Sequence, residues 1–251
     1  MIIKHPRGGA EITKWDDWTR PKAPDLHWKP GRSAQALARA WFETGVAAPP
    51  PEIIALLATN PRTADVRLDV GVPERVTGLP ERGDGRNHDL ALWGCTDAGA
   101  ILICVEAKVD ETFGSLIGEY WREAKARETP TRAPERIEKL LRLVFGDAAT
   151  PDKKPWSGLR YQLLTAVAGT LIEAAGTANL SIPLGVLVIH EFTEGADNDK
   201  RRTNDDDYTR FVETLFSVAG VTAGRLQGAK TFPAGDILKH GVDLLVGKAV
   251  R

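Results

Sequence analysis

Two oppositely charged residues, Glu106 and Lys108, end the apolar stretch ILICV and are separated only by Ala107. Successive side chains in a strand point to opposite faces, so residues 106 and 108 point the same way. A carboxylate and an ammonium group then stand side by side at the end of a buried strand. The pair is either an ordinary ion pair, which contributes about 0–1 kcal/mol when exposed, or part of a catalytic site.

A third charged residue, Asp89, begins the preceding strand-like segment, DLALWG. The turn residues Asp97 to Gly99 predict an antiparallel hairpin, which brings Asp89 close to Glu106 and Lys108. Two neighbouring carboxylates repel each other unless a cation lies between them, and oxygen ligands favour hard ions such as Mg²⁺ or Mn²⁺. A lysine beside such an ion can position or deprotonate an attacking water, or stabilise charge on a phosphate.

The elements that must position these residues follow from hydrophobic periodicity. Helical spacing predicts helices within residues 33–45, 49–60, 113–124, 137–144, 159–176 and 205–220. We interpret Asp205–Asp207 as the N-terminal capping residues of the last helix. Apolar runs and alternating patterns predict strands within residues 66–70, 88–96, 100–109, 182–192 and 241–251. The order indicates a mixed α/β domain over residues 33–251, with helices on both faces of a central sheet, after an irregular N-terminal arm of residues 1–32.

This arrangement resembles the PD-(D/E)XK, or restriction-endonuclease-like, nuclease superfamily. Asp89, a spacer, and then Glu106-Ala107-Lys108 after an apolar strand match its motif, although His88 stands where a proline often precedes the aspartate. The resemblance covers about residues 50–192 and implies a core of helix, three strands, helix and strand. It also implies that Asp89, Glu106 and the carbonyl of Ala107 hold Mg²⁺ or Mn²⁺, that Lys108 acts on water, and that Gln162 on a later helix assists. Either Glu43 or Glu52 would complete the site.

Composition limits the function classes. The 251 residues carry a net charge of −1, so nucleic-acid binding would need a local basic patch. Candidate phosphate contacts lie on and between the helices expected within residues 113–124 and 137–144: Arg122, Lys125, Arg127, Arg132, Arg136, Lys139 and Arg142. The glutamates interspersed among them make an ordinary solvated helical face the alternative. Two cysteines and an N-terminus without the apolar core of a signal peptide favour a cytoplasmic protein with no membrane span.

Two functions remain open on the sequence. The first is a metal-dependent nuclease whose expected partner is nucleic acid, with DNA as the substrate. The alternative is a non-catalytic module that keeps the nuclease fold and binds nucleic acid or protein. A homodimer is left open. His88 and Asp89 also spell the HD pair of metal phosphohydrolases, but no further histidine cluster accompanies them.

Overall fold

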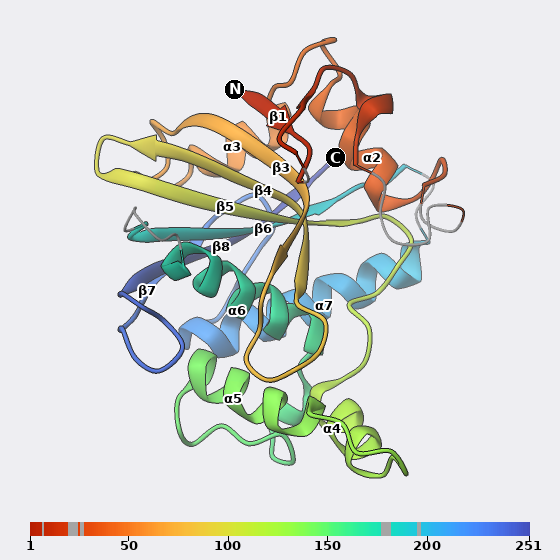
Figure 1. The fold of residues 1–251 in the computed structure, drawn as a ribbon, viewed down its shortest axis with the longest axis vertical. Helices are drawn as coiled ribbons and strands as arrows, with labels where there is room; N and C mark the ends of the chain where they lie inside the picture. Colours follow the sequence, from red (N-terminus) through yellow and green to blue (C-terminus); the bar gives the residue numbers. More distant parts are fainter. Residues whose placement is uncertain (7, 20–24, 26–27, 177–181, 195–196) are drawn as a thin grey trace.

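The computed structural model describes residues 1–6, 8–19, 25, 28–176, 182–194 and 197–251. Its centre is an eight-stranded mixed sheet in the order β2-β1-β3-β4-β5-β6-β8-β7 (Figure 1). The strands are β1 (Ile2–Lys4), β2 (Glu11–Ile12), β3 (Arg67–Thr77), β4 (Arg86–Thr96), β5 (Gly99–Lys108), β6 (Leu184–Glu191), β7 (Gln227–Phe232) and β8 (Val242–Val250). Strands β3, β4 and β5 form an antiparallel meander, and β5, β6 and β8 run parallel to one another.

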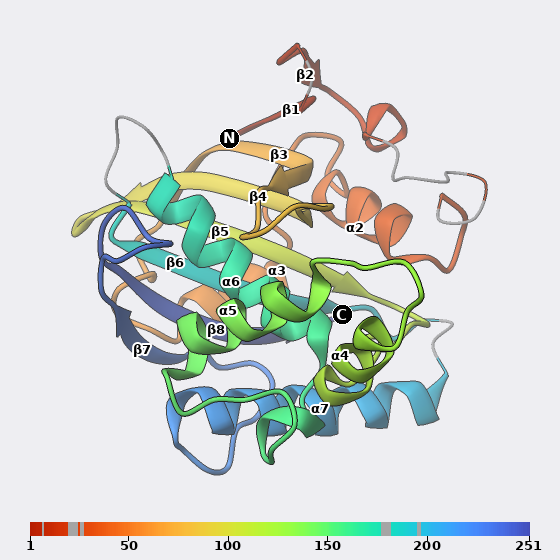
Figure 2. The same cartoon turned by 60° about the horizontal axis from the view of Figure 1, so that its bottom comes forward.

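The helices cover both faces of this sheet, as the sequence predicts (Figures 1 and 2). They are α2 (Ser33–Trp41), α3 (Pro51–Leu57), α4 (Ile117–Lys125), α5 (Ala133–Phe145), α6 (Tyr161–Gly176) and α7 (Asn198–Phe216), with 3-10 turns at Trp15–Asp17 and Trp156–Gly158. The side chains of β5 alternate between two cores: Ile103 and Val105 pack with α2 and α3, whereas Leu102 and Cys104 pack with α4–α7. The α/β class predicted from the sequence is confirmed.

The far end of the β3–β4 hairpin leaves the sheet and bends across α6. Pairing of β4 with β5 stops at Leu90 and Val105, and Figure 1 shows the gold hairpin continuing in front of α6. A Cβ atom on Gly169 of α6 would lie 2.7 Å from Cγ of Arg86, so this glycine makes room for the hairpin. Glu74 lies on the bent part of β3 with a φ of 53°, a left-handed conformation that is uncommon for residues other than glycine.

The N-terminal residues, which the sequence predicted to be an irregular arm, contribute two short strands to the sheet. Strand β1 pairs with β2 and in parallel with β3, so the sheet extends into residues 1–32. Ile3, Ile12 and Trp18 are buried in the same core as α2 and α3, and the Trp18 ring packs edge-on against Phe42. Strands of two or three residues are too short to show an alternating pattern, so the sequence did not reveal them.

Two helix starts also differ from the sequence expectation. Helix α7 begins at Asn198, because the Asp197 side chain accepts the backbone N–H groups of Asp199 and Lys200. Asp205–Asp207 therefore lie inside the helix and do not cap it. Helix α4 begins at Ile117, so residues 113–116, expected to be helical, form a loop instead.

Cys95 and Cys104 are free thiols, as the sequence predicts, and Cys104 is buried. In the described part of the chain, no helix combines the length and apolar character that crossing a membrane requires.

Candidate active site

Glu106 is the centre of a buried polar cluster at the end of β5. Its side chain and that of Lys108 lie on the α6 side of the sheet, with residue exposures of 2% and 3%. Lys108 Nζ donates to Glu106 Oε1 over 2.8 Å, and Gln162 Nε2 from α6 donates to the same oxygen over 2.6 Å. Three of the four catalytic residues predicted from the sequence therefore meet at one carboxylate oxygen.

Asp89 reaches the same place from β4. Its Oδ2 atom accepts the backbone N–H of Ala107 over 2.7 Å, which holds the carboxylate against the end of β5. Asp89, Glu106 and Gln162 line one cavity of about 400 Å³, which we call the Glu106 cavity. Burial raises the pKa of Asp89, and the positive charge of Lys108 opposes that rise.

Arg86 is a member of the cluster that the sequence did not reveal. It is buried on the bent end of β4, and its Nη2 atom donates to Glu106 Oε2. Both oxygens of Glu106 therefore bind donors from the protein itself. No periodicity marks Arg86, because its position depends on how the hairpin crosses α6.

Glu74 and Asn87 form a second group that the sequence did not reveal. Burial and the neighbouring charge of Asp89 raise the pKa of Glu74 to about 7, while the Asn87 side-chain amide donates to its carboxylate. The Asn87 side-chain oxygen is buried and has no hydrogen-bond partner among the described residues. Glu74 and a spare amide oxygen of Asn87 thus lie near Asp89.

The raised pKa of Glu74 predicts how the free energy of unfolding changes with pH. In the unfolded chain Glu74 has its ordinary pKa of 4.5, whereas the pKa of about 7 in the folded protein keeps the proton bound to higher pH. The free energy of unfolding therefore falls as the pH rises through this window, and the whole loss is present above it. Glu74→Gln removes the effect. The free energy of unfolding of this variant, relative to wild type, should therefore be about 1–3 kcal/mol higher at about pH 8 than at pH 4.5.

Urea unfolding of both proteins at the two pH values measures this gain. The variant Glu128→Gln, which changes an exposed carboxylate outside the cavity, serves as the control. A constant difference between Glu74→Gln and wild type across the window would contradict the burial of Glu74 as an acid.

The cluster fits a hard cation by the type of its donors but not by their present arrangement. Carboxylate and amide oxygens are the ligands that Mg²⁺ and Mn²⁺ prefer. Over the described ranges, however, no three His, Cys, Asp or Glu side chains gather closely enough to hold a metal ion. Arg86 binds the Glu106 oxygen that faces it, so a cation at Glu106 requires Arg86 to move.

Neither glutamate left open by the sequence enters this cavity. Glu52 accepts from His190 over 2.8 Å, and both Glu52 and Glu43 bind the Arg251 side chain. His88 is also bonded within the protein itself. Its ring is buried against Thr77 of β3, and burial holds its pKa well below the usual value.

Several candidate phosphate contacts have structural partners. Arg136 donates to the carbonyls of Pro80 and Asp84, which fastens the hairpin loop to α5. Lys139 pairs with Glu81 of the same loop over 2.5 Å. Part of the basic surface expected on α4 and α5 therefore supports a wall of the Glu106 cavity.

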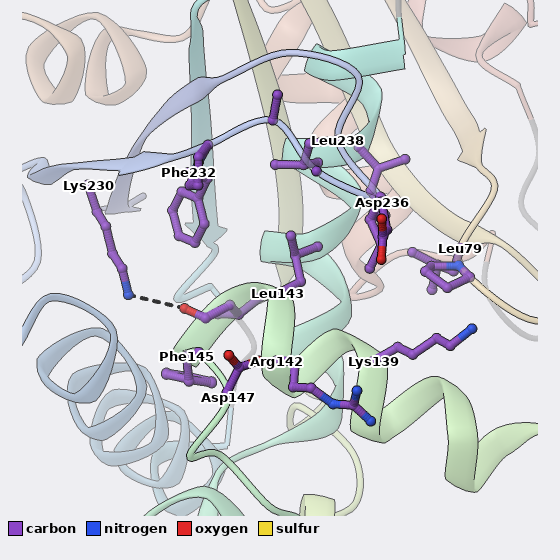
Figure 3. A pocket seen from close by; sticks show the side chains of 18 of the residues that line it. Leu79, Lys139, Arg142, Leu143, Phe145, Asp147, Lys230, Phe232, Asp236 and Leu238 are labelled. Atoms are coloured by element: carbon purple, nitrogen blue, oxygen red, sulfur yellow. Dashed lines mark hydrogen bonds between the residues drawn. The ribbon is translucent and has the colours of Figure 1, made fainter.

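A larger cavity of about 1090 Å³ lies between α5 and the β7–β8 connection (Figure 3). Leu143, Phe232 and Leu238 give it an apolar lining, whereas Asp89, Glu106, Lys108 and Gln162 lie outside it. Lys230 donates to the backbone carbonyls of Val144 and Leu215. Arg142, Asp147 and Asp236 also line this cavity.

Fold and site together define a mixed α/β protein with a buried cluster of carboxylates and cations where β4 and β5 end. The chain belongs to the family described as a domain of unknown function, DUF6946, whose model matches residues 11–251. No curated protein and no solved structure matches the chain.

Proposed function

We propose that the protein is a metal-dependent nuclease that hydrolyses phosphodiester bonds of nucleic acid, with DNA as the substrate. The proposal rests mainly on one observation: Lys108 and Gln162 bind the same oxygen of Glu106. Asp89 lines the cavity beside them. This is the side-chain set that the resemblance to PD-(D/E)XK nucleases implies for catalysis.

Asp89, Glu106 and the carbonyl of Ala107 would hold Mg²⁺ or Mn²⁺, and Glu74 adds a carboxylate that the sequence did not suggest. Burial is the main cause of the raised pKa of Glu74, and positive charge beside Asp89 would relieve the smaller contribution of repulsion. When bound, the ion would supply an acidified water and charge neutralisation at the phosphate.

The protein's own groups would orient the reaction. Lys108 can accept a proton at Nζ, because burial lowers its pKa to about 8. Gln162 would hold the Glu106 carboxylate in place through its amide. Arg86, once released from Glu106, would offer a planar pair of donors to a phosphate.

A non-catalytic module that keeps the fold is the second candidate, and the Arg86–Glu106 bond favours it. Arg86 and Lys108 together satisfy Glu106 without any metal ion. A site of this kind would bind nucleic acid or protein and never cut. Assays on single- and double-stranded DNA and RNA, with Mg²⁺, Mn²⁺ or chelator, separate the two candidates, since only the nuclease gives metal-dependent cleavage.

Metal binding should also appear as a change in thermal stability. Mg²⁺ at a hundredfold excess over its Kd should raise the Tm of the wild type by roughly 5–10 °C. Asp89→Asn keeps an acceptor for the Ala107 N–H and removes a buried charge, so its metal-free Tm should be equal or higher. Its Tm should not respond to Mg²⁺.

The matched control is Asp206→Asn, which removes an exposed carboxylate from α7 and should retain the wild-type response. An equal Mg²⁺ response in Asp89→Asn and wild type would rule out Asp89 as a ligand. We place this activity in the cytoplasm, where free thiols such as Cys95 and Cys104 persist.

A further inference from the structure

A second cavity adjoins the Glu106 cavity and extends it into a groove. This cavity, of about 810 Å³, contains Lys108 and is called the Lys108 cavity. Tyr120, Tyr161 and Gln162 line both cavities, so the two meet directly at the Glu106–Gln162 contact. The groove therefore runs past the candidate catalytic residues on both sides.

The two halves of the groove differ in charge. The Lys108 cavity contains Lys29, Arg32 and Lys108 against the single carboxylate of Glu111. Lys29 and Arg32 are exposed, and no ion pair within the described residues involves either of them. The Lys108 cavity can therefore attract phosphates, whereas Asp89 and Glu106 line the other cavity.

A pair of aromatic rings lies where the two cavities meet. The rings of Tyr120 on α4 and Tyr161 on α6 lie with their centroids 4.8 Å apart, and both side chains are half-buried. Aromatic rings beside a basic groove are the arrangement on which bases of single-stranded nucleic acid stack. Stacking of this kind needs an unpaired base, because the faces of paired bases are covered within a duplex.

The walls of the Lys108 cavity are fixed by side chains from distant elements. Arg160 donates to the carbonyl of Gly114 over 2.5 Å and pairs with Asp207 of α7. The Glu111 carboxylate accepts from Ser33 of α2, and its backbone carbonyl accepts from Asn204. The groove is therefore formed before any ligand arrives.

The depth at which Glu106 and Lys108 lie in the groove limits which substrates can reach them. Glu106 and Lys108 are 2% and 3% exposed, so the reacting phosphate has to enter the groove to reach them. In an intact duplex each backbone is tied to its partner strand, so one strand cannot enter the groove without the other. One unpaired strand is narrow enough and flexible enough to do so.

We infer that the groove receives one unpaired strand of nucleic acid, whose phosphates bind Lys29 and Arg32 while a base stacks on Tyr120 and Tyr161. The inference rests on the proposed function in that it assigns the substrate form to the same site. It makes the protein selective for single strands over duplexes of the same sequence.

Binding of a fluorescent single-stranded DNA oligonucleotide and of a hairpin duplex, measured by anisotropy in chelator, tests the inference. The single strand should bind more tightly. Tyr120→Leu, which keeps apolar packing but removes the ring, should weaken that binding by roughly 5- to 150-fold. Trp121→Leu is the matched control, because Trp121 lies on the same helix, bonded to Glu138 and outside both cavities.

The two basic residues are tested through salt dependence. Lys29→Ala/Arg32→Ala should reduce the slope of log K against log salt by about 1.4, the expected loss for two single-strand phosphate contacts. Lys153→Ala/Lys154→Ala removes two exposed lysines that lie outside both cavities and serves as the control for charge alone.

Cleavage of the same substrates keeps this inference separate from the proposed function. Single-strand binding that depends on Tyr120, without cleavage under any metal, would support the groove and overturn the nuclease. Cleavage with Tyr120→Leu and Lys29→Ala/Arg32→Ala equal to wild type would do the reverse. Equal binding of duplex and single strand overturns the inference.

Discussion

Glu106→Ala should lower the free energy of unfolding by about 3–5 kcal/mol, whatever the protein's function. Glu106 lies between Arg86 and Lys108, and all three side chains are less than a tenth exposed. Removing the carboxylate leaves two buried positive charges without their shared partner. The penalty for such uncompensated charges is larger than the attraction that the pair contributed.

Urea unfolding in chelator measures this loss without interference from metal. Glu81→Ala is the control, because Glu81 pairs with Lys139 near the surface and should cost at most about 1 kcal/mol. The double variant Arg86→Met/Glu106→Leu should recover much of the stability, since apolar side chains can replace a buried ion pair. A loss below about 1 kcal/mol in Glu106→Ala would mean that water reaches the cluster.

Lys108→Ala should lower the single-turnover rate of cleavage by a factor on the order of 10²–10³. Residues 101–105 supply the packing of β5, so the strand should survive the change. Binding of nucleic acid should fall only a few-fold, because Lys108 is one phosphate-directed charge among several. If binding and cleavage fell by the same factor, Lys108 would only contact the substrate and would have no separate role in catalysis.

The pH dependence tests the role of Lys108 further. Burial lowers its pKa to about 8, although the charges of Asp89 and Glu111 oppose the decrease. A neutral amine that accepts a proton from water gives a rate that rises with pH and levels off above about pH 8. A cation at Glu106 would lower the pKa further and shift the rise to lower pH. A rate that falls above about pH 8 would indicate that the ammonium form is required.

The contact between Gln162 and Glu106 could be predicted from the sequence, because the hairpin geometry and the family resemblance both depend on local sequence patterns. The period of two places Glu106 and Lys108 on one face, and the turn at Asp97–Gly99 returns Asp89 toward them. Gln162 opens a helix that covers this face. These features depend on the order of the elements and not on their detailed packing.

Arg86 and Glu74 could not be found in the same way. Both depend on the bend that carries the β3–β4 hairpin over α6, where Glu74 adopts a positive φ and Gly169 leaves space. No propensity marks that bend in the sequence. The sequence also could not decide between Glu43 and Glu52. Both pair with Arg251, which is far from them in the sequence, and neither lines the Glu106 cavity.

The most direct test of the central claim is single-turnover cleavage of an end-labelled single-stranded DNA by wild type and Glu106→Gln, with Mg²⁺ or chelator. The glutamine keeps the shape of the side chain and one acceptor for Lys108 and Gln162, but removes the charge that a cation needs. We predict cleavage by wild type with Mg²⁺, none in chelator, and none by Glu106→Gln at DNA concentrations where both proteins bind. Equal cleavage by the two proteins, or binding by wild type without cleavage under Mg²⁺ or Mn²⁺, would contradict a metal-dependent nuclease centred on Glu106.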